Sequence, residues 1–231
     1  MGKRLIVSAL CTTLIALGCA APAAIAGHPV TKPVGWGPLT SEQAANRVQP
    51  SSWEPRPDNR TANGTVPGTA QLRDWRKQSD MPYARFVDGG FRGTTDEIIQ
   101  WAAYKWGFRP GVLRAVATVE SWWHQSAVGD NGDSFGLFQV RRPYHCRGEC
   151  RIARDSTAFN ADYYGGILRA YYDGKMTWLN TVERGRDYRA GDLWGSVGAW
   201  YAGRWWTDPA KQYIRTVCAR LAERTWRTPG F

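Results

Sequence analysis

One glutamate of this chain stands where a carboxyl group would stay protonated. Glu120 lies near the end of a segment with helical apolar spacing, 110–123, and on a helical wheel it falls between Leu113 and Val116. Burial disfavours the charged carboxylate, and so does the dipole at a helix C-terminus, so both raise the pKa. A carboxylic acid kept protonated near neutral pH can protonate the leaving oxygen of a glycosidic bond. The alternative is that Glu120 pairs with a basic side chain such as Arg114.

The residues after Glu120 extend this pattern. VES at 119–121 is followed by GDNGDSFGLFQV at 129–140. The two blocks resemble the bacterial lysozyme-like lytic transglycosylases and goose-type lysozymes, which combine a helix-terminal Glu-Ser with a downstream Gly-Leu-x-Gln. NADYYGGIL at 160–168 resembles the family's next helix, and AWYAG at 199–203 stands where a Tyr-Asn-Ala-Gly segment is usual. The resemblance covers roughly residues 94 to 215.

The resemblance implies cleavage of the β-1,4 bond between N-acetylmuramic acid and N-acetylglucosamine in peptidoglycan. Glu120 would be the general acid and then the base, supported by Ser121. Asp130 matches a carboxylate that goose-type enzymes use to position water, and Tyr201 would bring a hydroxyl near Glu120. The residues expected to contact the substrate are Ser121, Asp130, Gly136, Phe138, Gln139 and Tyr201.

Three departures from the family pattern bear on the reaction. Arg141 replaces a second aspartate of the goose-type pattern, Trp200 replaces a frequent tyrosine, and Tyr201 replaces an asparagine. Direct hydrolysis needs a second carboxylate or another way to hold water on the far face of the sugar. A transglycosylase needs one acid/base, because the sugar's own 6-hydroxyl attacks. Since Arg141 opposes Asp130, we expect transglycosylation; a hydrolytic muramidase, and Asp130 as a simple turn residue, are the alternatives.

These residues require helices to position them. Residues 94–231 predict a mainly α, lysozyme-like domain with a small β-hairpin or strand near Glu120. Thr94 and Glu97 offer a capping box, Gly107 ends that helix, and Pro110 opens the next. Later helices are expected at 159–173, 193–201 and 209–226.

The chain before Thr94 has two parts. Residues 1–26 combine a basic start, an apolar run and an Ala-Ile-Ala site, which predicts a secretory signal peptide. Lipoprotein processing at Cys19 is the alternative, and it would anchor the chain to a membrane. Residues 27–93 are rich in Pro, Gly, Asn, Ser and Thr without a sustained apolar period, so we expect an irregular linker or extended arm. Its tryptophans, including Trp75, indicate that parts of it dock.

Charge and export define the expected partners. The formal net charge of +10 suits an anionic surface such as a cell wall, and export makes nucleic acid the poorer choice. We therefore expect a secreted or cell-envelope monomer that acts on peptidoglycan glycan strands. No cofactor motif is present, and we expect neither a cofactor nor a metal.

The cysteines suggest disulfide chemistry. Cys146 and Cys150 lie four apart and can close a small loop, since export permits disulfides. Cys218 falls on the apolar side of a predicted helix, so we expect a buried thiol, with a Cys150–Cys218 bridge as the alternative. A zinc set of these cysteines with His145 is a weaker hypothesis.

The aromatic content also bears on function. Thirteen tryptophans and ten tyrosines offer flat faces on which sugars stack, and core packing is the competing explanation. The candidate platforms are Trp122, Trp205, Trp206 and Tyr163. Two rival functions fit the same residues: a noncatalytic wall-binding scaffold, and a chitinase or chitosanase of the same superfamily.

Overall fold

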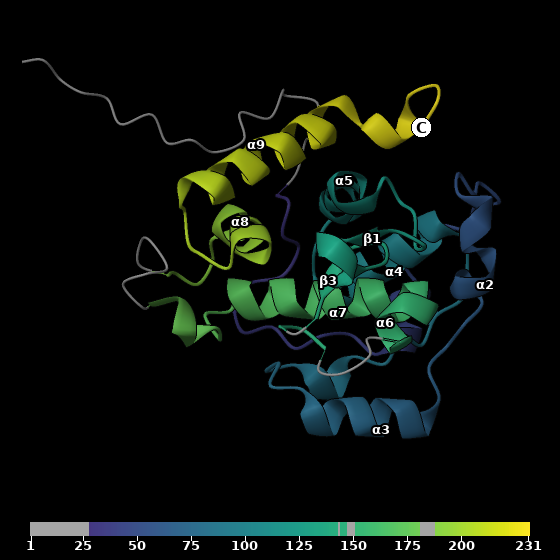
Figure 1. The fold of residues 1–231 in the computed structure, drawn as a ribbon, viewed down its shortest axis with the longest axis horizontal. Coiled ribbons are helices and arrows are strands. Elements are labelled where there is room, and N and C mark those ends of the chain that lie inside the picture. Colours follow the sequence, from purple (N-terminus) through teal and green to yellow (C-terminus); the bar gives the residue numbers. More distant parts are fainter. Residues whose placement is uncertain (1–27, 143, 147–150, 181–187) are drawn as a thin grey trace, which may run out of the picture.

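The computed structural model describes residues 28–142, 144–146, 151–180 and 188–231. The predicted signal peptide, Cys19 and Cys150 lie outside these ranges. The described chain is mainly helical, with a small three-stranded antiparallel sheet, so the predicted mainly α class is confirmed (Figure 1). None of its helices is long and apolar enough to span a membrane.

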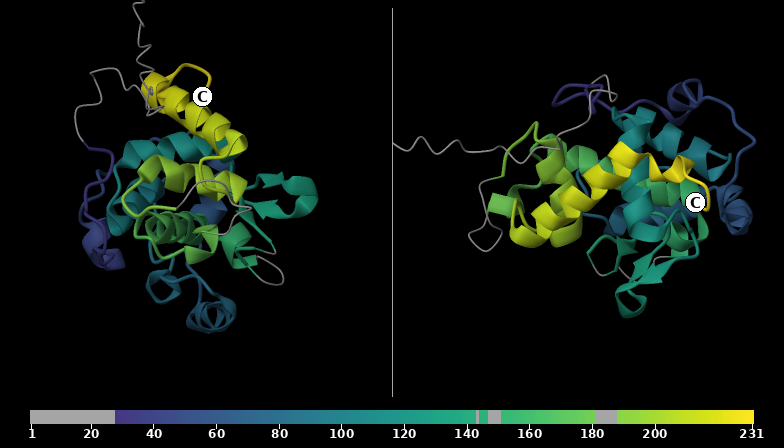
Figure 2. Two further views of the ribbon diagram at one scale, coloured as in Figure 1. Left: turned by 90° about the vertical axis from the view of Figure 1, so that its left-hand side faces the viewer. Right: turned by 90° about the horizontal axis from the view of Figure 1, so that it is seen from above.

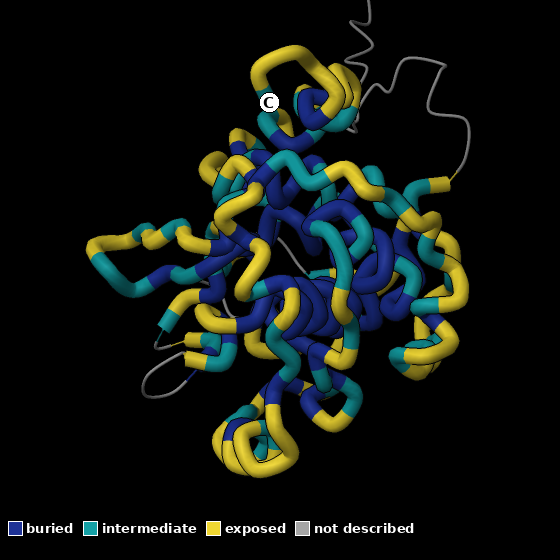
Figure 3. The backbone as a smooth tube through the Cα atoms, turned by 90° about the vertical axis from the view of Figure 1, so that its right-hand side faces the viewer, coloured by how far each residue is buried: buried dark blue, intermediate teal, exposed yellow. Residues whose placement is uncertain are grey.

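Two helices form the centre of the molecule, α4 (Thr95–Trp106) and α7 (Thr157–Tyr172). Every residue of α7 is buried, and the buried backbone gathers at the centre of the molecule (Figure 3). Gly165 permits the close packing, because a Cβ there would lie 2.3 Å from Trp106 Cδ1. Packing therefore explains a glycine of the 160–168 block.

The helix ends follow local sequence signals. The capping box of Thr94 and Glu97 is confirmed, and Gly107 ends α4 in the left-handed conformation at φ 77°. Pro110 begins the next helix, as predicted. The later predicted helices are confirmed within a few residues. The remaining helices of this part are α5 (Pro110–Ser121), α6 (Arg151–Asp155), α8 (Leu193–Ala202) and α9 (Asp208–Glu223).

The small sheet lies downstream of α5 and projects from the helices (Figure 2, left). Its strands are β1 (Val128–Gly129), β2 (Ser134–Phe135) and β3 (Val140–Arg141). Phe135 pairs with Val128 on one side and Val140 on the other. The predicted hairpin is thus present, within the 129–140 block.

Residues 28–93 form an arm packed on the same core. It contains α1 (Ser41–Ala45), α2 (Arg60–Asn63) and α3 (Thr69–Gln78), and α3 lies on the side opposite α9 (Figure 1). The docking predicted from Trp75 is confirmed: its buried ring meets Phe159 edge-on, with centroids 5.1 Å apart. Buried apolar residues of this segment belong to the same core cluster as the later helices, and the division of the chain at Thr94 stays a prediction. The expected irregularity is wrong for these three helices, of which α3 has ten residues and buries Trp75.

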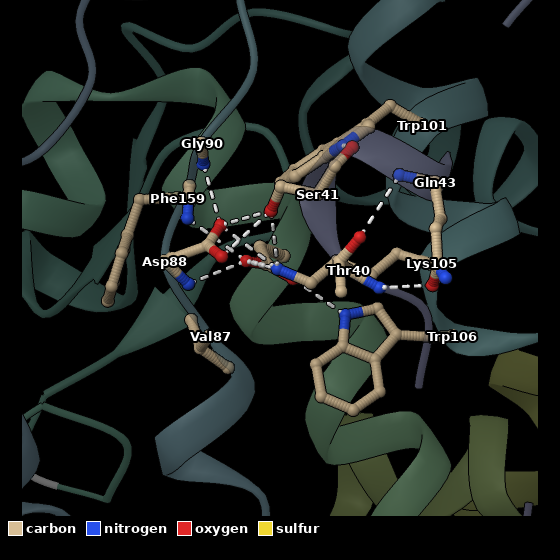
Figure 4. Close-up of polar contacts among 12 residues, drawn as sticks. Thr40, Ser41, Gln43, Val87, Asp88, Gly90, Trp101, Lys105, Trp106 and Phe159 are labelled. Atoms are coloured by element: carbon tan, nitrogen blue, oxygen red, sulfur yellow. Dashed lines mark hydrogen bonds and ion pairs between the residues drawn. The ribbon is translucent and has the colours of Figure 1, made fainter. Parts of the chain in front are cut away.

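A buried ionic cluster joins the arm to the helical core. We call Ser41, Asp88, Lys105 and Asp162 the Lys105 network. Figure 4 labels Ser41, Asp88 and Lys105. Lys105 Nζ lies 2.7 Å from Asp162 Oδ2, 3.0 Å from Asp88 Oδ1 and 3.2 Å from Ser41 Oγ. Asp162 also accepts hydrogen bonds from the Trp106 indole and the Asp88 backbone. Burial raises the pKa of Asp162, and Lys105 opposes that shift.

The structure gives the disulfide state of two cysteines, Cys146 and Cys218. Cys218 is disulfide-bonded, so the expected free buried thiol is wrong. Its position on α9 leaves it half-buried, where another part of the chain can reach the sulfur. Cys146 is also disulfide-bonded, whereas Cys150 lies outside the described residues. A sulfur held in a disulfide is no thiolate, which removes these two from any zinc set.

Candidate active site

Glu120 is the penultimate residue of α5 and is half-buried. Burial raises its pKa from 4.5 to about 7, and the charge of Asp130 adds to the rise. Hydrogen bonds with the side chains of Tyr213 and Trp200 act in the opposite direction. Pairing with Arg114 is excluded, because that guanidinium binds Asp96 through two bonds of 2.7 and 2.8 Å. The elevated pKa predicted from the helical wheel is confirmed.

Tyr213 is the hydrogen-bonding partner that sequence reasoning missed. It comes from α9, and its hydroxyl donates to Glu120 Oε1. Tyr201, which was expected to bring a hydroxyl near Glu120, instead stacks on Tyr213 with centroids 4.7 Å apart and planes 2° apart. The available signal was the apolar spacing of Tyr213 with Ile214 and Val217, which predicts a buried ring whose hydroxyl needs a partner.

Tyr164 and Trp200, which interact with Glu120, belong to a group of packed aromatic rings. Phe138 stacks on Tyr164 at 4.3 Å, and Tyr164 meets Trp200 edge-on at 5.1 Å. All three side chains are buried. The side chain of Trp200 also interacts with Glu120, and this interaction lowers the pKa of the carboxyl group. Low polarity on this side explains why the charged carboxylate is disfavoured.

Ser121 connects the end of α5 to the segment that follows the hairpin turn. Its hydroxyl donates to Leu137 O at 2.8 Å. Gly136 has φ 78°, and a Cβ there would lie 2.4 Å from Asn160 Nδ2. Two further side chains, which were not among the predicted site residues, hold the backbone of this segment. Gln125 Oε1 accepts from Leu137 N at 3.0 Å, and Asn160 Oδ1 accepts from Phe138 N at 2.8 Å.

Three predicted substrate contacts turn out to hold this segment together. The Phe138 side chain is fully buried, and Gly136 is buried as well. The Gln139 amide donates to Gly136 O at 2.9 Å and Ala127 O at 3.3 Å, so it closes the hairpin. Phe138 and Gly136 are therefore buried, the half-buried Gln139 side chain has internal partners, and contact of these residues with a substrate stays a prediction.

Asp130 has the contacts of a turn residue, and its charge also acts on Glu120. It is exposed at φ 49°, and Ser134 Oγ donates to its Oδ2 at 2.5 Å, as in a turn residue. Arg141 Nε lies 3.4 Å from the same oxygen, so the predicted opposition of the two charges is confirmed. The carboxylate raises the pKa of Glu120 through its charge. Asp130 thus raises the pKa of Glu120 while its own carboxylate contacts Ser134 and Arg141.

The chain leaves α5 through an unusual turn. Trp122 and Trp123 have φ values of 54° and 65°, and the left-handed region costs a non-glycine residue roughly 1 kcal/mol or more. Trp123 is buried, whereas Trp122 is 39% exposed. Among the candidate sugar platforms, Trp205 and Tyr163 belong to the core. Trp122 and the 59% exposed Tyr201 keep accessible faces.

The assembled residues suit acid–base chemistry. A carboxyl group with a pKa of about 7 can donate a proton to a leaving oxygen and later accept one from an attacking hydroxyl. One neighbouring hydroxyl, that of Tyr213, stabilises its charged form. No family model matches this chain, and no curated protein matches it either.

Proposed function

We propose that the protein cleaves the N-acetylmuramic acid–N-acetylglucosamine β-1,4 bond of peptidoglycan, with Glu120 as general acid and then base. The observation that carries the proposal is the half-buried Glu120 carboxyl group, whose pKa burial raises to about 7. The resemblance of its surroundings to lytic transglycosylases specifies the bond. The protein would act as an exported monomer on glycan strands in the cell envelope.

The reaction needs Glu120 first to donate a proton and then to accept one, and a pKa of about 7 suits both transfers. At neutral pH about half of the molecules carry a protonated carboxyl group, ready to protonate the glycosidic oxygen. The hydroxyl of Tyr213 then stabilises the carboxylate left behind. That carboxylate accepts the proton of the sugar's 6-hydroxyl as this oxygen attacks the anomeric carbon. The step leaves a 1,6-anhydromuramyl end and regenerates the acid.

The pairing of Asp130 favours this intramolecular attack over hydrolysis. A second carboxylate must be free to hold and deprotonate water if hydrolysis is to occur directly. Asp130 is engaged by Ser134 and Arg141. A hydroxyl of the substrate itself needs no such carboxylate. Hydrolysis is the second candidate, because the charge of Asp130 does reach Glu120.

Product analysis separates the candidate functions. Digestion of purified sacculi should release muropeptides with anhydromuramyl ends, lighter than hydrolysed ends by the mass of one water, as read by mass spectrometry. Reducing muramyl ends alone would assign the protein to the muramidases. Release of sugars from chitin or chitosan without action on sacculi would indicate the rival glycosidase. Binding to walls without any product would indicate a scaffold.

The Tyr213→Phe variant tests the partner of Glu120. The hydrogen bond from Tyr213 lowers the pKa of Glu120, so its loss should raise that pKa above about 7. The acid is active when protonated, and activity is lost as pH rises through its pKa. The alkaline limb of the pH–activity profile should therefore move to higher pH in the variant.

Tyr104→Phe provides the matched control for this experiment. Tyr104 is a half-buried tyrosine on α4, and its hydroxyl has no part in the contacts around Glu120 described above. Its profile should coincide with that of the wild type. An alkaline limb that stays in place or moves downward in Tyr213→Phe would contradict the role given to this hydroxyl.

A further inference from the structure

The N-terminal arm contacts the backbone that immediately follows Glu120. Arg56 Nε donates to Trp122 O at 2.8 Å, and Asn59 Nδ2 donates to Trp123 O at 2.8 Å. Both arm residues are buried, Asn59 to 1% exposure. The contacts cross 66 and 64 residues of sequence. The arm thus reaches the left-handed turn of Trp122 and Trp123.

Asn59 holds this turn from both sides. While its amide group donates to Trp123 O, its Oδ1 accepts from Gln125 N at 2.8 Å. The same amide donates to Thr95 Oγ1 at 3.0 Å, at the start of α4. One side chain therefore fixes the turn after α5 to the first residue of α4.

The contacts continue toward the rest of the site. Gln125, whose backbone binds Asn59, uses its side chain to accept from Leu137 N. Leu137 O in turn accepts from Ser121, the residue next to Glu120. A closed chain of buried hydrogen bonds thus runs from the arm through the turn and the 136–139 segment back to α5.

Two consecutive left-handed tryptophans are not a conformation that the local sequence favours. Such a turn persists where surrounding contacts over-determine it. Without the bonds from Asn59, the turn can relax toward ordinary backbone angles, and the last turn of α5 moves with it. Glu120 lies two residues before Trp122, so its carboxyl group would leave its half-buried position.

We propose that Asn59 is a positioning residue for Glu120, assisted by Arg56, and that the arm is in this way a functional part of the active site. The catalytic consequence rests on the function proposed above. A small misplacement of a reacting group can reduce a rate about a hundredfold.

The chain offers a matched pair of asparagines for the test. Asn63 lies on the same arm, is 4% exposed, and donates to Glu54 Oε2 and Thr95 Oγ1. None of these contacts reaches the turn after α5. Asn59→Ala and Asn63→Ala each remove a buried amide that binds Thr95, and they differ in the contact with the Trp122–Trp123 turn.

The expected results separate positioning from general stability. In Asn59→Ala, kcat on sacculi should fall roughly tenfold to a hundredfold with KM little changed. The alkaline limb of its pH profile should move below about pH 7, because a displaced carboxyl group regains water and its pKa returns toward 4.5. Asn63→Ala should keep the wild-type kcat and profile even where its melting temperature falls. Equal kcat losses in both variants would overturn the proposal.

A second readout does not depend on activity. The Glu120 carboxyl ¹³C resonance, identified by its absence in Glu120→Gln, can be titrated by NMR in each full-length variant. A lowered Glu120 pKa in Asn59→Ala, with the Glu120 pKa unchanged in Asn63→Ala, supports the positioning role. This holds even if the wild type cleaves no peptidoglycan, because the absence of cleavage would refute only the proposed function. An unchanged pKa in Asn59→Ala would overturn the positioning role. If Asn59→Ala does not fold, Arg56→Met takes its place, because it removes the donor to Trp122 O. A lowered Glu120 pKa in Arg56→Met would then support the positioning role, and an unchanged pKa would overturn it.

Discussion

Glutamine at position 120 is expected to lower the rate of peptidoglycan cleavage about a thousandfold, because general acid catalysis typically contributes a factor of 10² to 10⁴. The amide has nearly the shape of the carboxyl group and can still accept the hydrogen bond from Tyr213. It cannot donate a proton to a glycosidic oxygen. Turnover of purified sacculi, followed by released muropeptides, measures the loss.

The fold of this variant should be intact. A folded-state pKa raised from 4.5 to about 7 means that the contribution of Glu120 to wild-type stability is full below pH 4.5 and is lost as pH rises through 7. Glu120→Gln lacks this ionisation, so its melting temperature should match the wild type at pH 5 and equal or exceed it at pH 8. Glu42→Gln, on the exposed face of α1, is the control and should retain full activity. Wild-type rates in Glu120→Gln would end the assignment of the acid.

Lys105→Met is expected to have the largest effect on stability. Lys105 is 1% exposed and contacts two carboxylates of the Lys105 network, Asp88 and the fully buried Asp162. Removing the cation leaves these negative charges close together with no buried counter-ion, which typically costs about 3–5 kcal/mol. Unfolding in urea at pH 7 measures the loss.

The pH dependence identifies the cause. In Lys105→Met the carboxyl groups become easier to protonate, so the deficit in unfolding free energy should be smaller at pH 4 than at pH 7. Lys77→Met, on the exposed face of α3, should change stability by less than about 0.5 kcal/mol. A Lys105→Met protein as stable as the wild type would show that the network provides specificity without net stabilisation.

The sequence predicted those parts of the fold that local signals determine. The capping box of Thr94 and Glu97, the stop at Gly107 and the start at Pro110 each depend on a few neighbouring residues. The place of Glu120 at the helix end, on the flank of the apolar stripe, follows from the same short window, whereas its pKa is raised by burial in the folded protein. These predictions needed no knowledge of which helices pack together.

Other features of the site depend on contacts that no local pattern reveals. Tyr213 reaches Glu120 across 93 residues, so its role could not be read from either segment alone. The left-handed turn at Trp122 and Trp123 has no glycine or asparagine to mark it, because tertiary hydrogen bonds impose it. The helices of the arm escaped prediction for a related reason. α1 and α2 have only five and four residues, and polar side chains such as Asn59 make the contacts with distant parts of the chain.

The contacts at the end of α5 also set an order of events during folding. Asn59 precedes Glu120 in the chain, and Tyr213 follows it near the other end. Contacts between residues so far apart in the chain form late in folding. The entropy cost of closing a long loop comes first, and the favourable contacts offset it only afterwards. Before the surrounding chain has packed on α5, water reaches the Glu120 carboxyl group, and burial does not yet raise its pKa above the ordinary value of 4.5. The proton-donating form at neutral pH is therefore a property of the folded tertiary structure around α5 and not of the isolated helix.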